Sequence, residues 1–578
     1  MAKDRVVVFV KGEGEVVLTT NNYISSGGEG SVWAKNGTAY KLYHDPSKMI
    51  PLGKIQELSV LDDPNIIRPL NVLLDKQGKP IGYTMRQLPE TVPLPRLFTK
   101  AFKVKERISH EKILDMVIKM AKRLTFIHSR KIIVVDYNEM NFAALKDFSD
   151  TLNFDVDSYQ TPSYGATALM ESVRDRHAKI KSYDSDGRPH YEFNEGTDFF
   201  SFAVVSFQLF IGIHPYKGRH PKIKYDDAAK TLDERMGKNI SVMNSEVAVP
   251  PVCYPLDVIP NNWRDWYRQV FEKGIRIAPP LDKGTITAAV KFHTIGMGDK
   301  LKIVEILTTK GDIVGVYYSS GQSVILTDQM VIVNKQHLSF SQVKAVGFTT
   351  KYNHAIIGYL EKNQIKLYNS TLREEITVHN VADAMFDSGG RIYFLTGCNV
   401  MEMQFMELTN QTIAAPKIVA QVLPQATQAY NGVVIQNILG SIFATIFPAT
   451  NTSYQIHLSE LEKCKIIDAK YENHVLMVVG FIGGKYDCFI FRFNNSFDKY
   501  DCRIVADVQT TGLNFTVLDK NICVTLNEDD TLEIFHNQPG TNQITHIKDK
   551  ELGDIQLFHD GITTLAAKGN KLYSITTK

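Results

Sequence analysis

The sequence predicts a multidomain chain in which an α+β part is followed by an all-β part. Its 578 residues are too many for a single hydrophobic core, so two to four domains are expected. Apolar residues recur with helical spacing in the first half of the chain, most clearly over 110–130. After about residue 278 this periodicity is lost, and short β-rich runs separated by turn residues follow. The change of pattern places the boundary between the two parts.

Composition narrows the class of protein. The chain is 44% hydrophobic and 22% charged, with a formal net charge of +2, so no overall electrostatic field favours nucleic acid or a membrane. The apolar run near the N-terminus is short and has the length of a strand, not of a signal peptide or a membrane span. We expect a cytoplasmic protein that binds neither nucleic acid nor membrane.

The first β segment contains a glycine cluster followed by a lysine. Strands are expected over 5–43 and 66–86. The stretch ISSGGEGSVWAKNGTAYKLYH (24–44) has the glycines first, then Val32, a turn at Lys35-Asn36-Gly37, and Ala39-Tyr40-Lys41. This order predicts strand, hairpin and strand, with a lysine on the last strand. Glycine also serves any tight turn, so the rest of the chain must decide whether the cluster holds phosphate.

Three helices are expected next. The helix over 110–130 has one apolar face, whereas 198–214 is apolar almost all round and should be buried on all sides. A third helix is predicted over 262–275, after an irregular proline-rich segment at 247–262.

Polar residues follow the first of these helices in an order suited to phosphoryl transfer. Asp136 and Asn141 lie in KIIVVDYNEMNFAAL, and Asp155 lies in TLNFDVDSYQ. Such a reaction needs a cation for the phosphates, oxygen ligands for Mg²⁺, and a carboxylate that orients the attacking hydroxyl. Asp157 competes with Asp155 for the magnesium role, because residues two apart on a strand face the same side.

These segments, taken in order, resemble the protein-kinase family over about residues 20–276. Ser25 to Val32 is similar to the glycine-rich loop, with Ser25 in place of the first glycine, and Asp198 in DFFSFA is similar to the aspartate that anchors the catalytic loop. GGEGSVW, YKLYHDPSK and FAVVSFQLFIGIHPYKG resemble, more narrowly, a group of atypical bacterial serine/threonine kinases. The resemblance implies a bilobal kinase-like fold, with an N-lobe at 1–88 and a C-lobe at 89–277.

The resemblance also implies roles for individual residues. It assigns Asp136 as the catalytic base, with Lys41 and Asn141 completing the catalytic set, and Asn141 and Asp155 as Mg²⁺ ligands. It places ATP against Gly27, Gly28, Gly30, Val32, Ala39, Lys41 and Glu57, with Glu57 as the carboxylate partner of Lys41. His128 is expected to be a packed core histidine.

Several positions depart from the family pattern. Val134-Val135 replace the His-Arg that precedes the catalytic aspartate, and Asp157 replaces a glycine. Glu171 and Arg276 are poorly placed for the ion pair that joins the activation segment to the end of the C-lobe, and both members of that pair could be missing. The docking of a substrate is the property that these departures affect most.

The second half repeats every 35–45 residues or so, the period of a four-stranded propeller blade. Units are expected near 301–338, 341–379, 380–424, 425–466, 467–507 and 511–547, with a short one at 553–578. We predict a linker at 278–300 and a β-propeller of six or seven blades at 301–578, closed by a strand at about 286–294. A sandwich or a solenoid is the alternative all-β fold.

The sequence therefore predicts an ATP- and Mg²⁺-dependent serine/threonine protein kinase whose propeller is a separate module that recruits a protein substrate or partner. Two alternatives stay open: a pseudokinase–propeller scaffold without catalysis, and a small-molecule kinase. Nothing in the sequence sets the oligomeric state.

Overall fold

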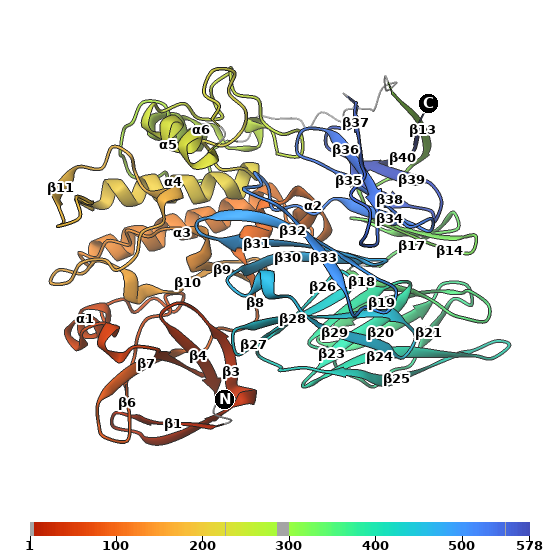
Figure 1. Ribbon diagram of the computed structural model, residues 1–578, viewed down its shortest axis with the longest axis horizontal. Helices are drawn as coiled ribbons and strands as arrows, with labels where there is room; N and C mark the ends of the chain where they lie inside the picture. The colour runs from red at the N-terminus through yellow and green to blue at the C-terminus, as the bar shows by residue number, and fades with distance from the viewer. Residues whose placement is uncertain (1–4, 226, 286–299, 341, 550, 578) are drawn as a thin grey trace.

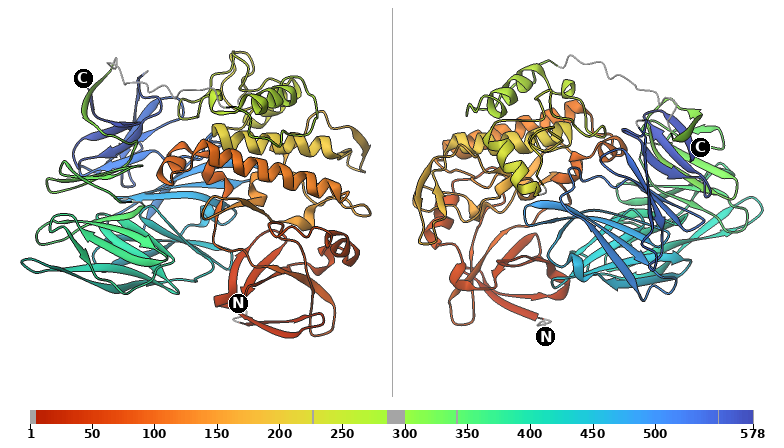
Figure 2. Two further views of the ribbon diagram at one scale, coloured as in Figure 1. Left: turned by 180° about the vertical axis from the view of Figure 1, so that it is seen from behind. Right: turned by 45° about the horizontal axis from the view of Figure 1, so that its top comes forward.

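The computed structural model contains an N-terminal region of mixed sheet and helix and a C-terminal region of sheets. It describes residues 5–577 except 226, 286–299, 341 and 550. We call residues 5–285 the N-terminal region and residues 300–577 the β region. The two regions lie side by side (Figures 1 and 2). The multidomain α+β and all-β organisation is confirmed.

A seven-stranded antiparallel sheet opens the N-terminal region. Its order is β2-β1-β6-β7-β5-β4-β3. The hairpin between β4 and β5 turns at Asn36 and Gly37, whose φ angles of 51° and 79° suit a two-residue primed turn. The predicted strands over 5–43 and 66–86 are present as β1 Arg5–Val10, β2 Gly14–Thr19, β3 Tyr23–Ser26, β4 Gly30–Lys35, β5 Thr38–Tyr43, β6 Val72–Leu74 and β7 Pro80–Arg86.

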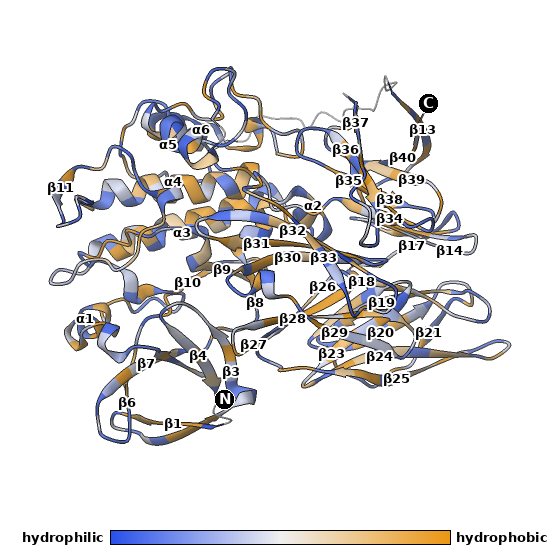
Figure 3. Ribbon diagram, viewed as in Figure 1, coloured by the Kyte–Doolittle hydropathy of each residue, from blue (hydrophilic) through white to orange (hydrophobic). Residues whose placement is uncertain are grey.

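The N-terminal region also contains helices, of which α3 and α4 lie side by side (Figure 1). α4 (Glu195–Ile211) begins at Asn194, whose side chain accepts two backbone N–H groups, and ends before Gly212, which has a φ of 94°. Every residue from Thr197 to Ile211 is buried, so the prediction of an all-round buried helix is confirmed. Figure 3 marks hydrophobic stretches on α3 and α4. The other helices are α1 Leu52–Leu58, α2 Lys100–Lys105, α3 His110–Ser129, α5 Ala228–Gly237 and α6 Asn261–Phe271.

Short strands complete the N-terminal region. β8 Thr91–Pro93, β9 Phe142–Leu145 and β10 Thr151–Asn153 form a sheet of order β10-β9-β8, and β11 Ile180–Tyr183 pairs with β12 Pro189–Tyr191. The loop before β9 carries Asp136 and Asn141 of the predicted site, and the segment after β10 carries Asp155.

The β region consists, in its described residues, of seven four-stranded antiparallel sheets. Six of them each use four consecutive strands. The first three are β14 Ile313–Ser319, β15 Gln322–Thr327, β16 Val331–Val333 and β17 Gln336–Leu338; β18 Val343–Phe348, β19 Ala355–Glu361, β20 Gln364–Asn369 and β21 Glu374–Ile376; and β22 Ala384–Ser388, β23 Arg391–Thr396, β24 Asn399–Glu407 and β25 Thr412–Gln421. The next three are β26 Thr427–Tyr430, β27 Val433–Ile438, β28 Ser441–Ala449 and β29 Thr452–His457; β30 Lys465–Glu472, β31 Val475–Ile482, β32 Lys485–Phe493 and β33 Tyr500–Val505; and β34 Phe515–Leu518, β35 Ile522–Leu526, β36 Thr531–His536 and β37 Ile544–Lys548.

The seventh sheet joins strands from opposite ends of the β region. β13 (Leu301–Thr308) pairs with β40 (Lys571–Thr577), beside β39 (Thr564–Lys568) and β38 (Gln556–His559). The predicted first unit, 301–338, was therefore wrong in one respect: β13 belongs to the last sheet, because its register matches β40 and not β14. The strand predicted at 286–294 lies outside the described residues.

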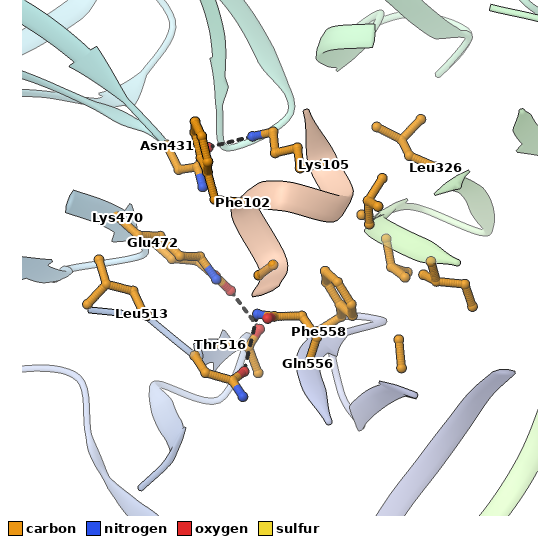
Figure 4. A pocket seen from close by; sticks show the side chains of 18 of the residues that line it. Phe102, Lys105, Leu326, Asn431, Lys470, Glu472, Leu513, Thr516, Gln556 and Phe558 are labelled. Carbon is orange, nitrogen blue, oxygen red and sulfur yellow. Dashed lines mark hydrogen bonds and ion pairs between the residues drawn. The ribbon is translucent and has the colours of Figure 1, made fainter. Parts of the chain in front are cut away.

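A cavity of about 700 Å³ is lined by strands β14, β18, β22, β30, β34 and β38 of the β region together with α2. Helix α2 of the N-terminal region enters it, and Lys105 donates a hydrogen bond to Asn431 Oδ1 at 3.1 Å (Figure 4). Charged side chains on the wall include Lys470 and Glu472, 2.9 Å apart. The cavity therefore belongs to both regions of the chain.

The two regions also share apolar contacts away from the cavity. Ala426 belongs to the core formed by Val8, Trp33 and Tyr40 of the N-terminal sheet, with Leu423 packed against it. Among the described residues, no helix combines the length and the apolar character needed to cross a membrane.

Candidate functional site

Strands β3, β4 and β5 position the glycine cluster. Gly27 and Gly28 lie in the turn between β3 and β4, where a Cβ atom on either would meet no other atom within 4 Å. A Cβ on Gly30 would lie 2.3 Å from the carbonyl oxygen of Leu42, so close strand pairing requires this glycine. The turn is thus open beside its first two glycines and tightly packed at the third.

Val32, Ala39 and Lys41 share one face of the sheet. Val32 is the register partner of Lys41 across β4 and β5, and Ala39 stands two residues before Lys41 on the same strand. Ala39 is buried and Val32 is half-buried. The structure therefore brings the predicted nucleotide-contacting residues of these strands together.

Lys41 reaches from this face to the segment that follows β10. Its Nζ donates to Asp157 Oδ2 at 2.7 Å and lies 3.6 Å from Asp155 Oδ1 and 3.4 Å from Glu29 Oε2. Burial opposes the charged form, but the carboxylates of Asp157 and Asp155 outweigh it and raise the pKa of Lys41. The lysine is therefore a fixed cation.

Glu57 does not pair with Lys41. Its Oε2 accepts a hydrogen bond from the backbone N–H of Ser163 at 3.2 Å. The seven-residue helix α1 starts after Pro51 and presents Glu57 to the segment around Ser163. The predicted pairing was wrong, and Asp157 is the carboxylate that Lys41 contacts most closely.

Asp155 and Asp157 differ sharply in exposure. The side chain of Asp155 is 41% exposed, whereas that of Asp157 is 5% exposed and also accepts a hydrogen bond from Tyr43 OH at 2.9 Å. Burial and the neighbouring charge of Asp157 raise the pKa of Asp155. Burial also acts to raise the pKa of Asp157, but the charge of Lys41 outweighs it, so the pKa of that carboxyl is lowered. Asp155 is thus the carboxylate available to an added cation.

Asp136 and Asn141 meet on the loop before β9. Asn141 Nδ2 donates to the Asp136 carbonyl oxygen at 3.0 Å and lies 3.4 Å from Asp136 Oδ2. The backbone N–H of Phe154 donates to the Asn141 carbonyl oxygen at 3.0 Å, which ties this loop to the residue before Asp155. Asp136, Asn141 and Asp155 therefore converge although they come from two separate segments.

Asp136 already has a partner from a later segment. Its Oδ1 accepts a hydrogen bond from the backbone N–H of Met170 at 2.7 Å. An incoming hydroxyl would have to use Oδ2 or displace Met170. This contact could not be predicted from the sequence, because a backbone N–H donor is present at every residue type except proline.

Asp198 anchors the loop that carries Asp136. It is fully buried and accepts the backbone N–H groups of Val134 and Val135 at 2.7 and 2.8 Å, and it lies 2.9 Å from His128 Nε2. Val135 has a φ of 64°, a costly conformation for a β-branched residue, directly before Asp136. The expected anchoring of the loop by Asp198 and the buried position of His128 are confirmed.

The ion pair that could have been missing is present with a different acid. Arg276 Nε and Nη2 each lie 2.6 Å from the carboxylate oxygens of Asp175, which is buried. Glu171 pairs with Arg174 at 2.9 Å instead. Glu171, the acid considered from the sequence, does not contact Arg276, whose partner lies four residues later.

No protein-family model matches the chain, and no curated protein matches its sequence. The described residues also contain no cluster of three or more His, Cys, Asp or Glu side chains suited to a metal ion. Any functional assignment therefore depends on the arrangement of Lys41, Asp136, Asn141, Asp155 and their neighbours.

Proposed function

We propose that the chain is an ATP- and Mg²⁺-dependent serine/threonine protein kinase. The observation that supports it best is the convergence of Lys41, Asp155, Asn141 and Asp136 from β5, the segment after β10 and the loop before β9. Cation, metal ligands and carboxylate are the parts that phosphoryl transfer requires. The resemblance to kinases proposed from the sequence rests on the same residues.

The residues fit ATP and Mg²⁺. Gly27 and Gly28 leave open space for phosphates, and Asp155 and Asn141 offer oxygen atoms to a cation. Mg²⁺ commonly takes only one or two protein carboxylates, with water and substrate phosphates as its other ligands. When bound, it supplies charge neutralisation at the phosphates.

Each protein group has one proposed role. Lys41 holds phosphate charge, Val32 and Ala39 contact the nucleotide, and Asp136 orients the acceptor hydroxyl and takes its proton. Asp198 fixes the position of Asp136 through the two N–H groups before it.

The β region is proposed to be a seven-bladed propeller that recruits a protein substrate or partner. The pairing of β13 with β40 and the contacts of neighbouring first strands, such as β14 with β38 and β18 with β22, support a ring. The outer strands β24 and β25 expose Met406, Ile413 and Ile418, a surface suited to protein contact. We expect the protein to act in the cytoplasm.

A non-catalytic scaffold is the second candidate, and two observations favour it. Asp157 lies against Lys41, and Met170 donates to Asp136, so both groups have partners that ATP and a hydroxyl must displace. The kinase and the scaffold are both proposed to bind ATP, and they differ only in whether the γ-phosphoryl group is transferred to an acceptor.

The decisive test is incubation of the purified full chain with γ-labelled ATP and MgCl₂, with and without generic acceptor proteins. We expect label on an acceptor or on the chain itself, and none with Asp136→Asn. ATP binding by calorimetry without any transfer would support the scaffold, and the absence of Mg²⁺-dependent ATP binding would refute both candidates.

A further inference from the structure

The β region touches the loop that carries Asp136 and Asn141. Tyr486 OH on β32 donates to Glu139 Oε1 at 2.6 Å, and Lys465 Nζ on β30 donates to the Met140 carbonyl oxygen at 2.7 Å. Met140 packs in one apolar cluster with Ile467, Val479 and Tyr486. The β region thus contacts Glu139 and Met140, two of the four residues between Asp136 and Asn141 in the sequence.

The Lys465 ammonium contacts the two residues that directly precede the proposed magnesium ligands. Met140 directly precedes Asn141, and the Phe154 ring, whose centroid is 5.3 Å from Lys465 Nζ, directly precedes Asp155. These two positions are joined by the hydrogen bond from Phe154 N–H to the Asn141 carbonyl oxygen. A charge placed there adjoins the space between Asn141 and Asp155.

The charge of Lys465 has no local counter-ion. Within the described part of the chain, no carboxylate oxygen lies within 4.0 Å of its Nζ, and only one of the three ammonium hydrogens is used, on Met140. Four other cations between the two regions have a carboxylate partner: Arg96 with Asp468, Lys100 with Asp554, Lys217 with Asp507, and Lys344 with Glu106. Lys105, Arg107 and Arg219 instead donate to an amide oxygen or to backbone carbonyls of the β region. Lys465 differs from the four paired cations because no carboxylate pairs with its ammonium group, which leaves the charge available to a ligand.

The environment of Lys465 points to an anion between the two regions. Protein surrounds the ammonium, and this burial lowers the pKa of Lys465 to about 8, although Asp155 and Glu139 act in the opposite direction. The residue as a whole remains exposed to solvent, so a ligand can reach it. A surrounded but reachable cation without a carboxylate partner is suited to hold a phosphate group.

We propose that Lys465 of the β region contacts the terminal phosphate of ATP, so that the site for phosphoryl transfer is completed by both regions. The inference rests on the proposed kinase function. In the transfer, the acceptor oxygen forms a bond to the γ-phosphorus, the bond from that phosphorus to the β–γ bridging oxygen breaks, ADP leaves with that electron pair, and the hydroxyl proton passes to Asp136. Lys465 stabilises the negative charge on the transferring group from β30, as Lys41 does from β5.

The test compares nucleotide binding and transfer in the full chain carrying Lys465→Gln, Lys465→Arg or Lys463→Gln. Lys463 is an exposed lysine two residues earlier and serves as the matched control. Calorimetry with ATP·Mg and with ADP·Mg measures whether the terminal phosphate is recognised. We expect Lys465→Gln to weaken ATP binding about tenfold or more with ADP binding unchanged, and to lower kcat about 10²-fold, the usual effect of one lost charge-stabilising donor. Lys465→Arg should retain the ATP preference, and Lys463→Gln should behave as the parent.

Each other outcome has a definite meaning. Equal loss of ATP and ADP binding in Lys465→Gln, or no loss at all, overturns the role of Lys465 and leaves the kinase proposal standing. Failure of the parent to bind either nucleotide overturns both. If Lys465→Gln unfolds, Lys465→Met, which keeps the aliphatic stem, replaces it, and the ratio of ATP to ADP affinity remains the deciding quantity.

Discussion

The N-terminal region and the β region are stabilised in different ways. In the N-terminal region, buried acids join distant segments: Asp198 binds the loop at Val134, Asp175 binds Arg276, and Asp157 binds Lys41. In the β region, six of the seven sheets pair consecutive strands around apolar cores. The difference shows that one region depends on a few irreplaceable charged groups, whereas the other spreads its stability over many similar contacts.

The largest effect is expected at the proposed base. Asp136→Asn should lower the rate of transfer about 10²- to 10⁴-fold, because the amide cannot accept the hydroxyl proton. Binding of ATP·Mg should stay within about twofold, since the carboxylate is not proposed to hold nucleotide. Initial rates with labelled ATP measure the first quantity and calorimetry the second, with Asp62→Asn, an exposed acid, as control. Equal rates in Asp136→Asn and the parent would remove Asp136 from the mechanism.

Breaking a buried ion pair should be the largest change in stability. Arg276→Gln leaves Asp175 buried without its cation and should lower the free energy of unfolding by about 3–5 kcal/mol. Urea unfolding followed by tryptophan fluorescence measures it, because Trp263 and Trp266 lie on α6 nearby. Lys146→Gln, which breaks an exposed pair with Glu90, should cost at most about 1 kcal/mol. Similar losses in the two variants would show that burial of an ion pair does not set its contribution to the stability of the N-terminal region.

A single core change in the β region should cost less. Ile356 is fully buried in the core of the sheet of β18 to β21, and Ile356→Val removes one methylene from it. We expect a loss of about 0.5–1.5 kcal/mol in the free energy of unfolding. Denaturant midpoints of the full chain measure this loss. A loss as large as that of Arg276→Gln would mean that the β region also depends on unique positions.

The smallest expected effect is a dependence on pH inside the cavity. Burial lowers the pKa of His559, but Glu472, 3.2 Å away, raises it more, so the net shift is upward, with Lys470 and Asp519 also facing the ring. A raised folded pKa means that this contact stabilises the protein fully below about pH 6.5 and that the contribution is lost as the pH rises through the folded value. Unfolding midpoints of the parent and of His559→Gln should therefore differ most at pH 5.5 and converge toward pH 8.5. A constant difference would show that His559 acts only by packing.

Periodic features were predictable from the sequence, whereas long-range partners were not. Helices α3 and α4 and most strands follow from apolar spacing, and the convergence of Lys41, Asp136, Asn141 and Asp155 was expected from their order. The partner of Lys41 was not, because Glu57 and Asp157 are both acids and only the short α1 decides between them. The same limit applies to Asp175 and Arg276, and to Lys465, whose proximity to the loop depends on how two regions pack.

The assignment of β13 shows why such partners escape sequence patterns. β14 directly follows β13 in the sequence, yet β13 pairs with β40. That pairing depends on contacts formed across the whole β region. Periodicity predicts the length of each repeating unit, but it does not predict that the seventh sheet is completed by a strand from the start of the β region.

The pairing of β13 with β40 has a consequence for folding kinetics. Nearly the whole β region forms the loop that this pairing closes, so the entropy lost on closure is not compensated until the other sheets are in place. We infer that this strand pair forms last and that, until then, the unpaired edge of β40 can join a strand from a second copy. High protein concentration during refolding should therefore divert chains into swapped dimers or aggregates. The helices of the N-terminal region, whose contacts are local, should form faster than this strand pair.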